Sequence, residues 1–181
     1  MHPQLTDLVG QYRTSLDRLH DLRRTIPTQS WGRRPTPDRW SPAECVAHLN
    51  LTSAAFAPLL HEGLVRASGQ GGAVPSHYRR DFWGWLVAKL SGPSRRFRTK
   101  TMPTFVPTAD RPIDELIGEF ERLQADHVAC LREADSTPLH RVKIRSPFEA
   151  RIQASLFSAF AMIPGHQQRH LAQAEEAAAG H

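Results

Sequence analysis

The chain has 181 residues, of which 40% are hydrophobic, enough for one domain with a sizeable core. Its net charge of +5 and pI near 9.9 allow contact with anionic partners without choosing among them. No zinc-finger spacing, RNP aromatic motif or KH-type loop accompanies the basic residues, so nucleic-acid binding is not expected. No apolar run approaches the roughly 20 residues that span a bilayer, and no signal-peptide pattern is present, so we expect a cytoplasmic protein.

Periodic apolar residues predict the first two helices. The first runs from Leu5 to Ile26 and ends at Pro27. The second opens with the capping box Ser41-Pro42-Ala43-Glu44, in which serine is the N-cap, and ends near Arg66. Its face through Cys45, His48, Thr52 and Phe56 should be buried. Cys45 and Cys130 both lie in apolar helical patterns, so we expect free buried thiols and no disulfide.

The second half of the chain predicts two more helices. One begins near Pro112 and ends near Asp135. The other carries apolar residues from Ile152 onward, and the polar tail from Glu175 to His181 should fray. No stretch alternates convincingly as a strand. Four helices of about 20 residues, each with one apolar face, predict an all-α four-helix bundle over residues 1–181.

Two histidines, His166 and His170, are one turn apart on the apolar face of the last helix, so both imidazoles can reach one point. His48 points inward from the second helix. A single inward histidine is ordinarily a hydrogen-bonded core residue. A buried pair must find two partners, and one shared metal ion provides both. Imidazole suits zinc, nickel, copper and iron alike, and of these we expect zinc or nickel.

Three segments together resemble a known family. Residues 40–49 resemble the W-S-x-x-E-x-x-x-H-L motif of the DinB-like superfamily, most closely its DinB_2 branch. Residues 166–173 are similar to its H-x-x-x-H-x-x-Q ending. The segment Met102-Pro103-Thr104-Phe105-Val106-Pro107 resembles the proline-and-aromatic loop before its third helix. The resemblance covers nearly the whole chain apart from an insertion at about 67–100.

The resemblance implies an up-down-down-up bundle with a divalent metal on His48, His166 and His170. Characterised members include S-transferases and isomerases that use low-molecular-weight thiols such as bacillithiol or mycothiol, and proteins called metal-dependent hydrolases; several members are homodimers. The implied function is a metal-dependent thiol S-transferase or hydrolase acting on a small-molecule substrate. The alternative is a non-catalytic, metal-containing stress-response or binding bundle that contacts an anionic partner.

Three further residues could support the metal site. A ligating imidazole usually donates its other N–H to an oxygen, and Gln173 and Glu44 are near enough in sequence to His170 and His48 to accept it. Glu44 has the alternative role of serving only its capping box, which we favour. His127 lies on the inner face of the third helix and is interpreted as a core or site-lining residue, with a fourth ligand as the alternative.

The insertion mixes glycines, aromatic residues and arginines. It contains the segment His77-Tyr78-Arg79-Arg80-Asp81-Phe82-Trp83-Gly84-Trp85. Three interpretations stay open: aromatics packed on the bundle or a dimer partner, a lid over the metal site, or an interfacial helix on a membrane.

Overall fold

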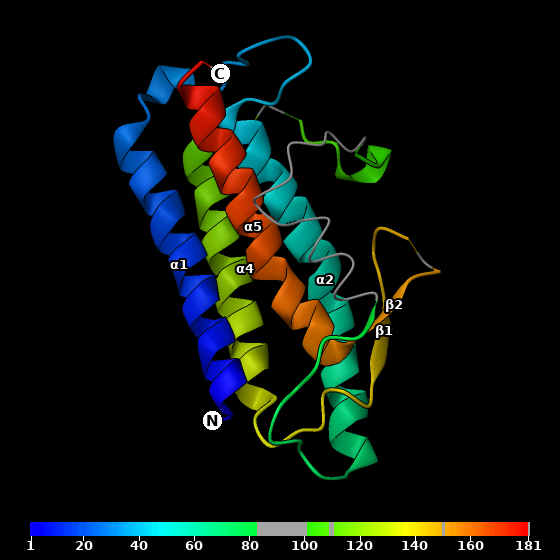
Figure 1. The fold of residues 1–181 in the computed structure, drawn as a ribbon. Coiled ribbons are helices and arrows are strands. Elements are labelled where there is room, and N and C mark those ends of the chain that lie inside the picture. The colour runs from blue at the N-terminus through cyan, green and yellow to red at the C-terminus, as the bar shows by residue number, and fades with distance from the viewer. Residues whose placement is uncertain (83–100, 109–110, 150, 181) are drawn as a thin grey trace.

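The computed structural model describes residues 1–82, 101–108, 111–149 and 151–180. Four long helices make up most of this part of the chain (Figure 1): α1 (Pro3–Thr25), α2 (Pro42–Gln70), α4 (Ile113–Glu133) and α5 (Leu156–Ala178). Two short 3-10 helices, η1 (Thr28–Ser30) and η2 (Pro103–Phe105), and two strands, β1 (Lys143–Arg145) and β2 (Gln153–Ser155), lie in the connections. Among the residues described, no helix is both long and apolar enough to cross a membrane.

The helices form an up-down-down-up bundle, as predicted. Figure 1 shows α1 and α5 running in one direction and α2 and α4 in the other. Each of α1 and α2 packs against both α4 and α5. Because α2 and α4 are parallel, the chain between them must return along the length of the bundle. Residues 83–100 of this connection lie outside the described part.

A layer of polar side chains divides the core into two apolar clusters. One cluster includes Leu5, Phe56 and Phe160, and the other includes Leu19, Leu49, Phe120 and Leu171. On every helix a buried polar residue separates them in sequence: Ser15, Ser53, Gln124 and Gln167.

The two glutamines of this layer exchange hydrogen bonds across the bundle. Gln124 Nε2 donates to Gln167 Oε1 at 3.1 Å and Gln167 Nε2 donates to Gln124 Oε1 at 2.8 Å. Gln124 Nε2 also donates to the Tyr12 carbonyl at 3.0 Å. Both amides are thus satisfied at a depth where an unpaired one would cost about 1–3 kcal/mol.

The expectation of no strand is wrong. β1 pairs with β2 in an antiparallel hairpin, with Ile144 opposite Ala154. Each strand has only three residues, too few for an alternating pattern to stand out in the sequence. Ile144 is buried and packs where α2 has Gly63; a Cβ at that glycine would lie 2.9 Å from both Ile144 Cγ2 and Leu156 Cδ1. The missing side chain therefore lets the hairpin and α5 approach α2 closely.

Several helix ends also differ from the prediction. The last helix begins at Leu156, not by Ile152, because Ser155 caps it by accepting from the Ser158 amide. α2 continues to Gln70, past Arg66. The tail does not fray at Glu175, since α5 runs to Ala178 and Arg18 holds Glu175 through an ion pair of 2.6 Å.

Candidate metal centre

The three predicted histidines meet inside the bundle. His48 comes from α2, and His166 and His170 come from α5, and their candidate ligand atoms all lie within 4.8 Å of one another. The ring centroids are 4.4 Å apart for His48 and His170, 4.5 Å for His166 and His170, and 5.3 Å for His48 and His166. We call these three residues the histidine group. In the described part of the chain, no carboxylate or cysteine belongs to it.

The start of α2 fixes the position of His48. Ser41 Oγ accepts from the Glu44 amide at 3.2 Å, and Glu44 Oε2 accepts from the Ser41 amide at 2.8 Å. This reciprocal capping box satisfies two of the free amides at the helix start. His48 follows Glu44 by one helical turn and therefore takes a fixed place on the inner face.

A proline precedes the pair on α5. Pro164 has no N–H, so the carbonyl of Phe160 loses its partner within the helix. The Tyr12 hydroxyl on α1 donates to that carbonyl at 3.3 Å. The helix thus continues through Pro164 to the histidines with the exposed acceptor satisfied by a neighbouring helix.

One hydrogen bond sets the orientation of His48. Its Nδ1 lies 2.8 Å from the Phe105 carbonyl in η2. A carbonyl only accepts, so Nδ1 must carry the proton, and the lone pair of the neutral ring is left on Nε2. This is the arrangement that metal-ligating histidines ordinarily adopt.

Burial keeps the histidine group neutral. It lowers the pKa of His48, brings that of His166 to about 3 and holds that of His170 well below its ordinary value. Mutual repulsion within the group adds to the effect for His166 and His170, and the positive charge of Arg169 adds to it for all three residues. Each ring therefore keeps a lone pair available at neutral pH.

The donor atoms fit a metal ion. His166 Nε2 and His170 Nδ1 are buried and have no hydrogen-bond partner in the described structure. Each unsatisfied buried polar atom costs about 1–3 kcal/mol. A divalent ion shared by the group would give these nitrogens a partner, so the group could hold one.

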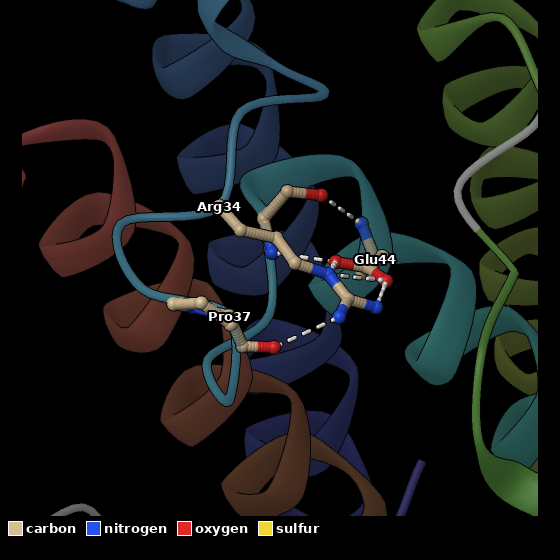
Figure 2. Close-up of polar contacts among 4 residues, drawn as sticks. Arg34, Pro37 and Glu44 are labelled. Carbon is tan, nitrogen blue, oxygen red and sulfur yellow. Dashed lines mark hydrogen bonds and ion pairs between the residues drawn. The ribbon is translucent and has the colours of Figure 1, made fainter.

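Glu44 serves the capping box and an ion pair instead of the histidine group. Figure 2 shows the Arg34 guanidinium directed at its carboxylate, with Nε donating to Oε2 at 2.8 Å and NH2 to Oε1. Arg34 NH1 also donates to the Pro37 carbonyl at 3.1 Å. Burial alone would raise the pKa of Glu44, but the bonds from Arg34 and Ser41 lower it on balance. The carboxylate is thus charged and fully engaged.

The remaining candidate residues take different places. The Gln173 amide lies beside His170 and acts to raise its pKa, against the effect of burial. His127 is fully buried in the core, where its ring meets Tyr12 edge-on at 5.8 Å between centroids, and it does not belong to the histidine group. The burial of His127 agrees with its interpretation as a core residue.

Three aromatic residues surround the group, and the sequence did not single them out as site residues. Trp40 packs against His48 and His170, with centroid distances of 4.9 and 5.9 Å. Phe148, in the loop between β1 and β2, lies 6.1 Å from His166 and 4.8 Å from Phe105. Trp40 and Phe105 lie within the motifs that resemble the family, so the sequence could have identified them as site residues. Phe148 depends on a hairpin that the sequence did not reveal.

The comparison with protein families agrees with this architecture. The DinB_2 model, described as the DinB superfamily, matches residues 11–174. The chain belongs to the DinB superfamily. Searches of the curated proteins and of the solved structures found no match.

In this DinB superfamily chain, neither cysteine is available as a nucleophile. Cys45 and Cys130 are free and buried. Burial raises the pKa of each thiol to about 12, so both are protonated at neutral pH. A thiolate that reacts at this site would have to come from another molecule.

The insertion is described only in part. Tyr78 is buried, stacks on Phe157 at 4.7 Å and donates to the Thr137 carbonyl at 2.6 Å. This portion packs on the bundle. The lid and membrane interpretations depend on Trp83, Trp85, Arg95, Arg96 and Arg98, which lie outside the described residues.

Proposed function

We propose that this chain is a metal-dependent enzyme that activates a thiol or a water for attack on a small electrophilic substrate. The observation that carries the proposal is the histidine group: three neutral imidazoles, two of them buried and one partly exposed, with their donor atoms within 4.8 Å. Catalytic zinc sites characteristically use three protein ligands and leave one position for water or substrate, whereas structural sites are closed by four. A set without a fourth protein ligand in the described chain favours the catalytic class.

The chain's own residues supply position and charge. The Phe105 carbonyl holds the Nδ1 proton of His48, and the position of His48 one turn from the capped start of α2 limits its movement. Burial keeps all three rings unprotonated. A divalent ion bound here would supply a nucleophile by lowering the pKa of a water or a thiol.

A low-molecular-weight thiol is the cosubstrate we favour for a transferase reaction. The protein's two cysteines are buried and protonated, so they do not provide the thiolate themselves. We propose zinc or nickel as the ion, because imidazole nitrogen suits both. Hydrolysis is the corresponding reaction if water takes the place of the thiol.

Elemental analysis tests the metal site. The protein is purified without metal-affinity resin and compared with His166→Ala, His170→Ala and the control His20→Ala, whose ring pairs with Glu121 at the surface. We expect about one ion per chain in the parent and the control, and at least tenfold less in the two site variants. Negligible metal in all four proteins, or equal metal in all four, would overturn the proposal.

A second assay separates the reactions. The metal-loaded protein is incubated with an aryl halide or an ester, with and without a small thiol. If the parent releases halide only when the thiol is present, and His166→Ala does not release it, the protein is a transferase. If the parent cleaves the ester without thiol, and His166→Ala does not cleave it, the protein is a hydrolase. A metal-loaded protein inactive in both assays would favour the non-catalytic binding bundle.

A further inference from the structure

Three connections outside the bundle helices place aromatic residues next to the histidine group. Trp40 comes from the loop before α2, Phe105 from η2 and Phe148 from the loop of the hairpin. Trp40 contacts His48 and His170, whereas Phe148 contacts His166. We call Trp40, Phe105 and Phe148 the aromatic frame. The rings of Trp40 and Phe148 contact the histidines, and Phe105 contributes its carbonyl to His48.

Two members of the frame are partly exposed to solvent, as is one histidine of the group. His48 and His170 are only 4% and 8% exposed. His166, Trp40 and Phe148 are all partly exposed, while Phe105 is buried and its ring contacts that of Phe148. Trp40 and Phe148 are therefore the members of the frame that solvent reaches.

Phe148 packs edge-on against two other phenylalanine rings. Phe105 meets Phe148 edge-on at 4.8 Å, and Phe56 in the core meets it edge-on at 5.7 Å. Edge-to-face ring pairs stabilise each other by about 0.5–1.5 kcal/mol beyond the area they bury. These contacts stabilise the position of Phe148 beside His166.

The chemistry of these walls favours an apolar, flat ligand. Aromatic faces offer dispersion contacts and ring stacking, and they give no compensation for the lost hydration of a polar group. The carboxylate of Glu44, in the capping box, already accepts hydrogen bonds from Arg34 and from the Ser41 amide. The rings of Trp40 and Phe148 therefore offer a substrate beside the histidine group an apolar surface.

We propose that Trp40 and Phe148 are specificity-determining residues that bind an aromatic or similarly flat apolar part of the substrate next to the reacting atom. This rests on the proposed function, since it assumes an ion on the histidine group. It names a substrate class, small aromatic electrophiles, which that function alone leaves open.

A pair of matched probes tests this inference. Acetohydroxamate and benzohydroxamate carry the same metal-chelating group. The first has a methyl substituent and the second has a phenyl ring. Binding of each to the cobalt-loaded protein is followed through the visible absorption of the ion. We expect benzohydroxamate to bind about tenfold more tightly, as stacking on one or two rings would provide.

Variants locate the source of that preference. Phe148→Ala and Trp40→Ala should each reduce the ratio of the two affinities to about twofold or less, while acetohydroxamate binding stays within about threefold of the parent. Phe148→Leu keeps apolar bulk without a ring and should retain part of the preference. Val65→Ala, at a residue 73% exposed on α2, is the remote control and should change nothing.

The possible results separate the two proposals. Absence of any cobalt spectrum would overturn the proposed function, and this inference with it. A normal cobalt spectrum with equal affinities for the two probes, or a preference that survives both alanine variants, would overturn the aromatic frame alone. Because acetohydroxamate binding reports an intact site, an unfolded variant is recognised directly.

Discussion

At the scale of single residues, Glu44 is the clearest case of a buried charge with a structural role. Its carboxylate accepts from Ser41 and from Arg34, and it does not bond to His48. The motif that contains it also contains Trp40 and His48, so its capping box holds two residues of the site in their relative positions.

Glu44→Gln should leave the metal content unchanged. The glutamine oxygen can still accept from the Ser41 amide, but the charge-assisted bonds with Arg34 weaken, so the free energy of unfolding should fall by about 1–2 kcal/mol. Elemental analysis and urea unfolding measure the two effects. Loss of metal from a folded variant would show instead that Glu44 orients His48.

His127 should make stability depend on pH. Burial lowers its pKa to about 4 in the folded protein, against an ordinary value near 6.5. Between these values the unfolded chain binds the proton and the folded one does not. The neutral His127 ring therefore costs the fold no stability above pH 6.5, and the free energy of unfolding falls as the pH decreases from 6.5 toward 4.

Comparison with His127→Leu isolates this effect. From pH 8 to pH 5 the unfolding free energy of the metal-free parent should fall by about 2 kcal/mol more than that of the variant. Urea unfolding in the presence of a chelator gives both values. Parallel pH profiles would mean that His127 is not buried as a neutral ring.

At this scale the sequence predicted much of the site. His48, His166 and His170 could be placed on buried faces because helical periodicity fixes which positions share a face. Phe148 could not, because its place depends on the fold of a hairpin and on contacts with Phe56 and Phe105, which are distant in sequence.

At the scale of elements, η2 is the shortest helix with a direct part in the site. Its Phe105 carbonyl accepts from His48 Nδ1, and the Val106 amide donates to the Pro103 carbonyl at 3.2 Å to close the turn. The orientation of a metal-ligating ring thus depends on a turn of three residues.

Val106→Pro should weaken metal binding. Proline removes the amide that closes η2 and disfavours the helical conformation at Phe105, which turns the carbonyl away from His48. Loss of such an outer partner typically lowers metal affinity 10–100-fold. Val106→Ala retains the amide at a side chain 47% exposed, so it is the matched control. Equal zinc affinities in competition titrations would refute the role of the turn.

The helices were largely predictable and the connecting elements were not. Capping at Ser41 and the apolar stripes gave the four helices, because both signals are local. The hairpin is held by Ile144 in the core and by close approach to Gly63, and neither contact is visible in a short sequence window. The prediction of a frayed tail was wrong because Ala174 and Ala177 are buried and Arg39 forms an ion pair with Glu176 at 3.5 Å.

At the scale of the whole molecule, the histidine group joins α2 to α5 beside the polar layer that divides the core. The two apolar clusters lie on either side of this layer. An ion on the group would therefore link α2 to α5 near the layer where apolar packing is interrupted.

Zinc should stabilise the whole fold. At a free concentration 100 times its dissociation constant, zinc adds about 2.7 kcal/mol to the unfolding free energy if it binds only the folded chain. His170→Ala should lose most of this gain, and His20→Ala should keep it. Urea unfolding with and without zinc measures the difference, and an equal gain in both variants would place the ion elsewhere.

The direction of the helices was anticipated only through the family resemblance. Amphipathic stripes say which faces are buried, but several bundle topologies bury the same faces. The parallel arrangement of α2 and α4 follows from a long connection whose path no local pattern encodes.

The position of Trp40 gives the protein a built-in optical reporter. Its indole lies 4.9 Å from the His48 ring and 5.9 Å from the His170 ring, so a paramagnetic ion such as nickel or copper on the histidine group would quench its fluorescence. The chain has four tryptophans, so Trp40→Phe identifies the share that comes from this one. Occupancy of the site could then be followed in solution, in real time and without any substrate.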